Sequence, residues 1–379
     1  MVMIPGTTGQ SMTSGLFEVY QGKRVLVTGH TGFKGGWMSQ WLLSLGAEVF
    51  GVALPPEGET SLFEQLGLEK KLNHRICDIR HPDLLRKQLE EIRPEVIFHL
   101  AAQPLVRESY KIPLETVQTN VMGTVHLMEA IRSLGLSTTL IIITSDKSYE
   151  NREWVYGYRE NDPMGGYDPY SASKGACEVL AASWRRSFFH PSVFKEHGVK
   201  LATVRAGNVI GGGDWARDRI VPDCIRALLK DTPIDVRNPL ATRPWQHVLE
   251  PLGGYLLLGE KLIKTEDPDE LKTFCDAFNF GPLIGSNQTV ERLVEEVLKV
   301  WGTGTWTFDK QHAVHEASLL NLSIDKAFQL LGWLPVWDFS ETIQKTVEWY
   351  RTFRDDPEAI PGLTQQQINE YTASFVSTH

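Results

Sequence analysis

Short apolar runs alternate with amphipathic segments along the first half of the chain. Runs of strand length occupy residues 25–28, 48–54, 74–79, 96–101, 139–145 and 200–204. Apolar residues recur at helical spacing at 35–45, 84–92, 116–134 and 171–189. Because strands and helices alternate, the pattern predicts the α/β class, with a doubly wound parallel sheet that binds ligands across the carboxyl ends of its strands.

The alternation loosens after about residue 205. Glycine and proline interrupt the chain at 211–215, 238–239, 243–244 and 279–282, which indicates loops and turns. Helical spacing returns at 289–301, 324–331 and 340–353. We therefore expect a loose leader at 1–20, a large domain at 21–205, and a smaller, interleaved domain at 206–379 with segments that return to the large one.

Composition narrows the classes of partner. The 38 Lys and Arg against 47 Asp and Glu give a net charge of −9 without a basic stripe, so we expect no nucleic acid partner. No apolar run approaches membrane-spanning length and no signal peptide is visible, which predicts a cytoplasmic protein without membrane contact. The widely spaced Cys77, Cys177, Cys224 and Cys275 form no C-x-x-C pair, so reduced, buried thiols and no metal site are expected.

A glycine-rich turn follows the first apolar run. The string GHTGFKG at 29–35 lies between strand-like residues 23–28 and an apolar helical stretch at 37–43. In this context Gly29, Gly32 and Gly35 permit a tight turn, close approach to a pyrophosphate and close packing of helix on strand. The turn therefore predicts a Rossmann dinucleotide site.

The candidate chemistry lies at 144–147 and 170–174, with sequences TSDK and YSASK. Tyr170 and Lys174 share one face of a helix, so we expect the ammonium to lower the pKa of the phenol. With a hydroxyl such as that of Ser145 bonded to the oxygen, a tyrosinate can take the proton of a secondary alcohol while a hydride leaves the same carbon. A Tyr and a Lys at this spacing also occur by chance on solvated faces, and the glycine turn favours the chemical reading.

These motifs, with HLAAQ at 99–103, NVMGT at 120–124 and LGWLP at 331–335, resemble the extended short-chain dehydrogenase/reductases that modify nucleotide sugars. Strings at 29–35, 144–147, 165–170, 205–215 and 243–250 are similar to the 4,6-dehydratases of that family that act on CDP-glucose. The resemblance covers about residues 22–353.

The resemblance implies a reaction without net oxidation. Tyr170 would take the proton of the glucosyl C4 hydroxyl while NAD⁺ receives the C4 hydride; loss of the C5 proton and of the C6 hydroxyl as water, with hydride return to C6, would follow. Asp146 is expected to be the acid at C6. Lys147 replaces the Glu of other dehydratases and is either the C5 base or a stabiliser of the enolate. The alternative for Asp146 and Lys147 is a salt-bridged pair without a chemical role.

The resemblance also implies binding residues for the two domains. NAD would contact the large domain, and the substrate mainly the smaller one. Expected cofactor contacts are Gly29, Thr31, Gly32, Phe33, Lys34, Gly35, Asp78, Ile79, Leu100, Ala101, Ala102, Asn120, Thr144, Tyr170 and Lys174. Expected substrate contacts are Gln103, Asn208, Arg219, Arg243 and Asn279, although either Arg is also compatible with a plain surface position. No acid stands at 51–56 for the adenine ribose, so NAD affinity is expected to be modest.

Other interpretations stay open at this point. A 4-epimerase or reductase of the same family is the nearer rival, and Asp146-Lys147 argues against it. A non-catalytic dinucleotide sensor is the farther one, and the retained Ser145, Tyr170 and Lys174 argue against it. His99 and His247 are expected to be core histidines, and Trp215 to be packed. We expect a homodimer or higher oligomer through 116–134 and 171–189, with Leu127, Val179 and Leu180 at the interface.

Overall fold

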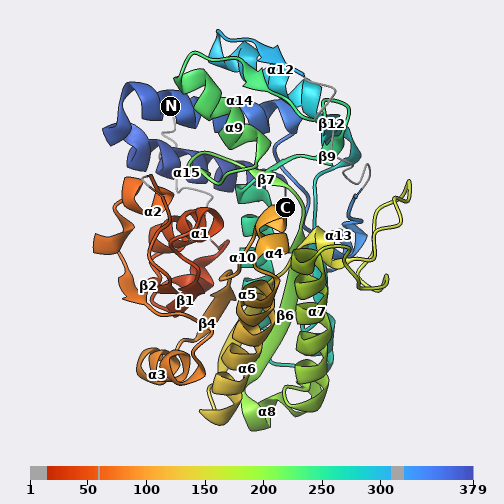
Figure 1. Ribbon diagram of the computed structural model, residues 1–379. Coiled ribbons are helices and arrows are strands. Elements are labelled where there is room, and N and C mark those ends of the chain that lie inside the picture. Colours follow the sequence, from red (N-terminus) through yellow and green to blue (C-terminus); the bar gives the residue numbers. More distant parts are fainter. Residues whose placement is uncertain (1–14, 59, 309–319, 379) are drawn as a thin grey trace, which may run out of the picture.

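The computed structural model describes residues 15–58, 60–308 and 320–378. A parallel seven-stranded sheet with the order β11-β6-β5-β4-β1-β2-β3 lies at its centre (Figure 1). The strands are β1 (Arg24–Thr28), β2 (Glu48–Ala53), β3 (Asn73–Ile76), β4 (Val96–His99), β5 (Thr138–Ile143), β6 (Val199–Ala206) and β11 (Ala277–Phe280). The predicted doubly wound sheet is confirmed, and the carboxyl ends of β1, β4, β5 and β6 form one edge.

Both faces of the sheet are covered, which is why its strands read as nearly continuous apolar runs. Val25 and Val27 of β1 join the hydrophobic core on one face, whereas Leu26 joins the core on the other. The helices α3 (Pro82–Ile92), α6 (Gly123–Ser133) and α7 (Pro169–Ser187) lie on the second face. The helices α1 (Phe33–Ser44) and α10 (Leu249–Lys264) lie on the first.

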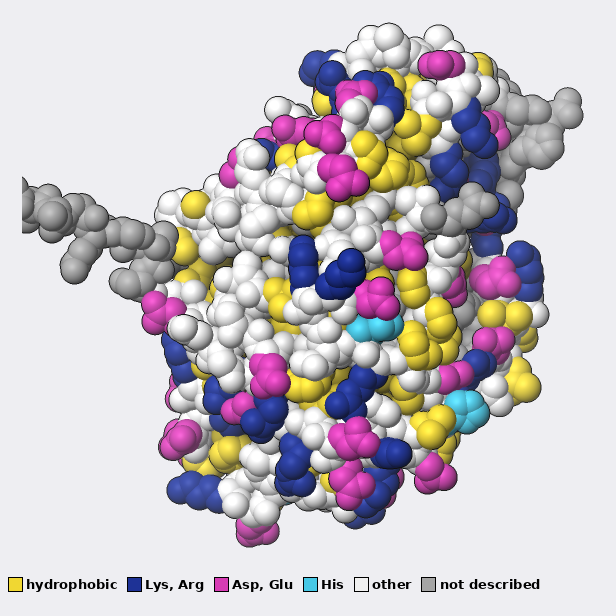
Figure 2. All heavy atoms as spheres, turned by 90° about the vertical axis from the view of Figure 1, so that its left-hand side faces the viewer, with side chains coloured by type: hydrophobic (Ala, Val, Ile, Leu, Met, Phe, Trp, Pro, Cys, Tyr) yellow, Lys and Arg dark blue, Asp and Glu magenta, His cyan; other side chains and the backbone are white. Residues whose placement is uncertain are grey.

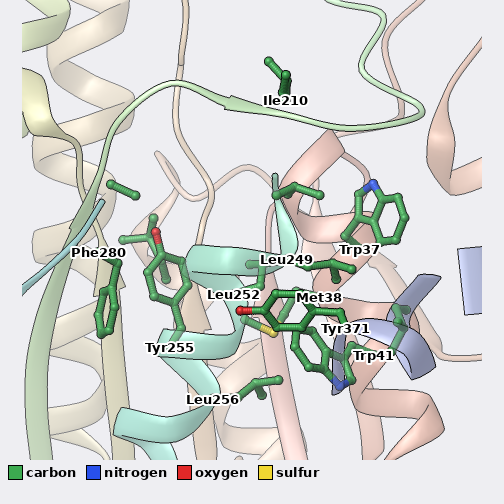
Figure 3. Close-up of a cluster of buried hydrophobic side chains, with 14 of the residues drawn as sticks. Trp37, Met38, Trp41, Ile210, Leu249, Leu252, Tyr255, Leu256, Phe280 and Tyr371 are labelled. Carbon is green, nitrogen blue, oxygen red and sulfur yellow. The ribbon is translucent and has the colours of Figure 1, made fainter. Parts of the chain in front are cut away.

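The last helix, α15 (Ile360–Thr378), packs on α1 and α10. Its Tyr371 is fully buried and lies with Trp37, Trp41 and Leu252 in the cluster shown in Figure 3. Large aromatic side chains of this kind bury about 150–250 Å² each. Residues of α15 thus complete the core behind the glycine turn, although they lie after residue 353, where the resemblance to the family was expected to end.

The single helix expected at 116–134 is interrupted. The structure has α5 (Pro113–Val117), a π-helical turn (Gln118–Met122) and then α6. The carbonyl of Asn120 accepts hydrogen bonds from Thr124 Oγ1 at 2.7 Å and Cys177 Sγ at 3.0 Å. Side chains of α6 and α7 are thus tied to this turn, and π-helical turns often mark functional sites.

The second half of the chain builds a smaller layer beyond the carboxyl edge of the sheet, at the top of Figure 1. Its helices include α9 (Ile220–Leu229), α12 (Val290–Trp301) and α14 (Phe339–Asp355), whereas α13 (Asp325–Leu331) packs against β11 and α10 beside the large sheet. Two-stranded pairings join β7 (Val209–Ile210) to β10 (Gln246–His247), β9 (Thr242–Pro244) to β12 (Asn287–Thr289), and β8 (Ile234–Asp235) to β13 (Trp306–Thr307).

Some segments of this half return to the large sheet. The strand β11 pairs with β6 in parallel, and α10 packs against β5 and β6. The turn expected at 279–282 is wrong for its first two residues, because Asn279 and Phe280 pair with Arg205 and Ala206 and end β11. The short helices α2 (Leu62–Gln65), α4 (Val106–Lys111), α8 (Phe194–His197) and α11 (Pro268–Phe274) complete the connections.

Residues 1–14 of the expected leader lie outside the described residues. The described part, from residue 15, is packed and not loose, because Phe17 and Tyr20 are fully buried and the Tyr20 hydroxyl donates to Leu256 O at 2.7 Å.

All four cysteines are free and buried. Within the described ranges, no helix has the length and apolarity needed to cross a membrane. On the face shown in Figure 2, acidic and basic side chains are interspersed.

Candidate active site

The glycine turn between β1 and α1 leaves its outer side open. Gly29 has φ 75°, and a Cβ there would lie 2.8 Å from Ala101 Cα. A Cβ on Gly35 would lie 2.1 Å from Gly29 O, so neither position accepts a side chain. A Cβ on Gly32 would meet only Gly29 O, at 3.4 Å. The unpaired N–H groups at the start of α1 therefore face an open approach, which fits the pyrophosphate of a dinucleotide.

Buried hydrogen bonds fix the neighbouring loop at residues 100–102. Thr28 Oγ1 accepts from Ala101 N at 3.2 Å and lies 2.8 Å from His99 Nδ1. The other ring nitrogen of His99 lies 3.0 Å from Thr124 Oγ1, and burial lowers the pKa of this imidazole to about 3. His99 is thus a neutral core histidine, as predicted, and it holds Leu100, Ala101 and Ala102 beside the glycine turn.

The ends of β2 and β3 supply the remaining expected cofactor neighbours. Thr31 Oγ1 donates to Leu54 O at 3.0 Å, and Asp78 forms an ion pair with Arg80 at 2.6 Å. Ile79 is buried, and its carbonyl lies 3.0 Å from His126 Nδ1. These residues border the side of the turn on which the adenosine of a dinucleotide lies in such sheets.

The TSDK string forms a compact cluster at the end of β5. Ser145 caps the turn Asp146–Ser148, with its Oγ accepting from Lys147 N at 3.2 Å and donating to Asp146 Oδ1 at 2.9 Å. Lys147 Nζ lies 3.9 Å from Asp146 Oδ1. Asp146 is 1% exposed, and its Oδ2 has no hydrogen-bond partner among the described residues. A buried carboxylate oxygen left in this way is suited to a hydroxyl of a ligand.

Tyr170 and Lys174 lie in the first turns of α7, which Asp168 caps by accepting from Ser171 N at 3.0 Å. Lys174 Nζ donates to Ile143 O at 3.1 Å. The expected fall in the pKa of Tyr170 is wrong for this structure. Burial raises the pKa of Tyr170 to about 12, whereas a hydrogen bond with Ser145 and the charge of Arg219 act in the opposite direction. Burial also lowers the pKa of Lys174.

Lys34 and Arg219 bring further positive charge to this cluster. Burial lowers the pKa of Lys34 to about 7, the nearby Arg219 lowers it further, and Asp146 opposes the shift. Arg219 forms an ion pair with Asp214 at 2.9 Å, and the charge of Asp214 raises the pKa of Arg219. Although Lys34 belongs to the glycine turn, its charge therefore acts on the groups expected to carry the chemistry.

Gln103 and Asn120 are bound to each other behind Tyr170. Gln103 N donates to Asn120 Oδ1 at 2.8 Å, and Asn120 Nδ2 donates to Ser173 Oγ at 2.8 Å. The side chain of Gln103 donates to Thr116 Oγ1 at 2.9 Å and accepts from Leu105 N. Both residues brace α7 against the π-helical turn.

The other expected substrate contacts are dispersed. Asn208 lies half-buried between β6 and β7, and Arg243 lies on β9 with its Nη1 donating to Thr242 O at 2.8 Å. Asn279 is fully buried; its amide donates to Tyr158 O and Ser323 O and accepts from the Tyr149 hydroxyl. The charge of Arg219 thus acts on Tyr170, whereas the amide of Asn279 is occupied by Tyr149, Tyr158 and Ser323.

Buried ionic residues that the sequence analysis did not single out support the site. Glu178 forms an ion pair with Arg205 at 2.9 Å, and both side chains are 4% exposed. Glu178 also accepts from the hydroxyls of Thr144 and Thr203. The sequence did carry a signal for Glu178: it stands four residues after Lys174, so both side chains lie on the same face of the helix. The pair joins α7 to the ends of β5 and β6.

A doubly wound sheet with a Ser-Tyr-Lys set at its carboxyl edge, beside an open glycine turn, defines an extended short-chain dehydrogenase/reductase. A model of the GDP-mannose 4,6 dehydratase family matches residues 26–346. The chain belongs to this family of nucleotide-sugar dehydratases.

Among the relatives, the chain is 50% identical to the CDP-glucose 4,6-dehydratase of Salmonella typhimurium over 356 residues, which cover 94% of this chain and 98% of that one. It is 29% identical to the dTDP-glucose 4,6-dehydratase of Streptomyces antibioticus, over 68% of this chain and 70% of the relative. The solved dTDP-glucose 4,6-dehydratase of Bacillus anthracis, in complex with NAD, has a TM-score of 0.71 at 20% identity, with 90% of this chain and 99% of that chain covered. This last likeness concerns the fold.

Proposed function

We propose that this protein converts CDP-glucose to CDP-4-keto-6-deoxyglucose and water, with NAD as a carrier that is regenerated in each turnover. The identity of 50% with a CDP-glucose 4,6-dehydratase over 98% of that protein supports the substrate. The observation that carries the reaction type is the buried Asp146, with an unpartnered oxygen beside Ser145 and Lys147. The open glycine turn and the NAD held by the Bacillus anthracis relative support the cofactor.

The first half of the reaction uses Ser145, Tyr170 and Lys174. When bound, NAD⁺ supplies a hydride acceptor at C4 and then, in its reduced form, a hydride donor at C6. Tyr170 takes the proton of the C4 hydroxyl, and the Ser145 hydroxyl orients the same oxygen. Burial raises the pKa of Tyr170 to about 12, and the hydrogen bond with Ser145, with a smaller contribution from the charge of Arg219, favours the tyrosinate.

The second half removes water across C5 and C6. The C4 ketone acidifies the C5 proton, and we assign its removal to Lys147 as a neutral amine; the alternative role for Lys147 is stabilisation of the enolate as an ammonium. Asp146 in its protonated form donates to the departing C6 hydroxyl. The separation of 3.9 Å between Lys147 Nζ and Asp146 Oδ1 allows the two groups to act on adjacent carbons.

We further propose that the two parts of the chain bind different ligands. We assign cofactor binding to residues 21–205, together with Gly29, Gly32, Gly35, Asp78, Asn120 and Thr144 as contacts. We assign substrate binding mainly to residues 206–379, with Arg219, which the Asp214 carboxylate holds at 2.9 Å, as the diphosphate contact. A guanidinium suits a diphosphate because it offers several donors in one plane.

A homodimer in the cytoplasm completes the proposal. Exposed apolar side chains lie along α5, the π-helical turn and α7, with Leu114 71%, Met122 43% and Val179 56% exposed. Exposed apolar side chains on neighbouring helices suit a two-fold interface. Leu127, expected at the interface, instead lies in the core, and Leu180 packs against that core.

The experiment is a comparison of sugar nucleotides with the purified full-length chain and NAD⁺. CDP-glucose should lose one water in mass spectrometry, and the product should show a 4-keto group and a C6 methyl group by NMR. The controls are dTDP-glucose, UDP-glucose and GDP-mannose, for which we expect much lower turnover. Inversion at C4 without loss of water would favour an epimerase, and binding of NAD without turnover of any substrate would favour a sensor.

A further inference from the structure

The turn Gly211–Trp215 lies between β7 and α9 and carries Asp214, which has no part in the chemistry above. Trp37 Nε1 of α1 donates to Gly212 O at 2.9 Å, and the Tyr350 hydroxyl of α14 donates to Asp214 O at 2.5 Å. Figure 3 shows the chain around Ile210 crossing over Trp37. Side chains from both halves of the chain thus hold the backbone of this turn.

Packing restricts the turn further. A Cβ on Gly212 would lie 1.9 Å from Trp349 Cγ, inside the buried indole. Gly213 has φ 80°, and a Cβ there would lie 2.5 Å from Leu62 Cδ1. Arg226 Nη1 also donates to Trp215 O at 3.0 Å. The backbone position of Asp214 is therefore set by several independent contacts.

The side chain of Asp214 faces Arg219. Asp214 is 4% exposed; its Oδ2 accepts from Arg219 Nη1 at 2.9 Å, and its Oδ1 accepts from Ala216 N at 3.1 Å. The charge of Arg219 acts on both Tyr170 and Lys34. Without a carboxylate beside it, a guanidinium in this place would be repelled by the Lys34 ammonium.

We propose that Asp214 is a positioning residue, which the turn presents to Arg219 so that the guanidinium is held in place to receive the diphosphate of the substrate. Asp214 acts through Arg219 and does not touch the sugar nucleotide. The inference rests on the proposed function for its ligand, a nucleoside diphosphate sugar.

The first test compares Asp214→Asn with Asp276→Asn in the full-length protein loaded with NAD. Asp276 is the control, because it also pairs with an arginine, Arg185, at 2.9 Å; it is half-exposed and pairs in addition with Lys326 at 2.6 Å. Loss of a charged hydrogen bond corresponds to about a 10- to 100-fold effect. We expect Asp214→Asn to raise KM for CDP-glucose and Kd for CDP, measured by calorimetry, by about that factor, with a smaller change in kcat. We expect no such rise for Asp276→Asn.

A double-mutant cycle separates positioning from general destabilisation. If Asp214 acts through Arg219, adding Asp214→Asn to Arg219→Met should cause no further rise in Kd for CDP. Additive effects of the two substitutions would overturn the proposal. The proposal would also be overturned if Asp214→Asn alone left KM for CDP-glucose and Kd for CDP at their wild-type values.

A milder pair of variants keeps the test valid should Asp214→Asn fold poorly. Tyr350→Phe removes the hydroxyl that holds Asp214 O, and Tyr20→Phe removes an equally buried hydroxyl that donates to Leu256 O at 2.7 Å. At similar melting temperatures, we expect Tyr350→Phe to raise Kd for CDP about fivefold and Tyr20→Phe to leave it unchanged. Equal Kd values for both would contradict the proposal. Failure of the wild type to bind CDP or dehydrate CDP-glucose would instead reject the proposed function.

Discussion

The end of β5 and the turn Gly211–Trp215 place side chains at the same site by different means. At β5, Ser145, Asp146 and Lys147 are consecutive, and their geometry follows from one strand and one short turn. At the turn, the position of Asp214 depends on Trp37 of α1 and Tyr350 of α14, which are distant in sequence. The groups at the end of β5 that we assign to the reaction are thus encoded locally, whereas the position of Asp214, to which we assign the orientation of Arg219, depends on how the two halves of the chain pack.

The largest effect should come from the groups that we assign to proton transfer at the carboxyl edge of the sheet. Tyr170→Phe removes one hydroxyl and little volume, so the fold and dinucleotide binding should persist while turnover falls about 10²- to 10⁴-fold. The measurement is the initial rate of water loss from CDP-glucose. Tyr167→Phe is the control, because Tyr167 is 99% exposed and precedes the same helix. Wild-type turnover by Tyr170→Phe would remove Tyr170 from the mechanism.

A smaller effect should come from the packed turn. Gly212→Ala places a Cβ inside the Trp349 ring, and overpacking of this kind costs about 1–3 kcal/mol of unfolding free energy. We expect a lower denaturant midpoint together with weaker CDP binding. Gly362→Ala on α15 is the control: nothing lies within 4 Å of its Cβ, so it should be neutral or slightly stabilising. If both variants have the same stability and affinity, the turn is not held by Trp349.

The smallest effect concerns pH and the second half of the chain. Burial lowers the pKa of His247 to about 3, from an ordinary value near 6.5. Because the unfolded state binds the proton more readily, His247 makes the unfolding free energy fall as pH drops below about 6.5, by about 1.4 kcal/mol at pH 5.5. Denaturant titrations at pH 7.5 and pH 5.5 should therefore show a smaller loss for His247→Gln than for the wild type. An identical loss in both proteins would mean that His247 is not held neutral by burial.

Much of the fold was predictable because the strands of the first half are separated by helices with clear periodicity. The glycine turn, Ser145 and Tyr170 were predictable for the same reason, since each belongs to a short string with its own chemistry. The helix α10 was missed because it is buried nearly all round and so lacks an apolar stripe. The helix α15 was missed because Pro361 and Gly362 stand in its first turn, where they read as a loop.

The properties that depend on tertiary burial were beyond the sequence. The spacing of Tyr170 and Lys174 suggested a lowered pKa for the phenol, but burial outweighs the charge of any neighbour. Likewise, the amide of Asn279 was expected to meet the substrate, yet it bonds to the carbonyls of Tyr158 and Ser323 inside the protein. Asp214 could not be assigned to Arg219 until the turn between β7 and α9 was placed.

We assign the loss of water to Asp146 and Lys147, and the variant Asp146→Asn tests this assignment most directly. Ser145, Tyr170 and Lys174 are unchanged in this variant, so oxidation at C4 should proceed while departure of the C6 hydroxyl is slowed. Stopped-flow absorbance after mixing with CDP-glucose and NAD⁺ should show NADH that accumulates and persists, with a bound 4-keto-glucose species on rapid quenching. The wild type should show only a brief transient. Formation of the 4-keto-6-deoxy product by Asp146→Asn at the wild-type rate would contradict the account.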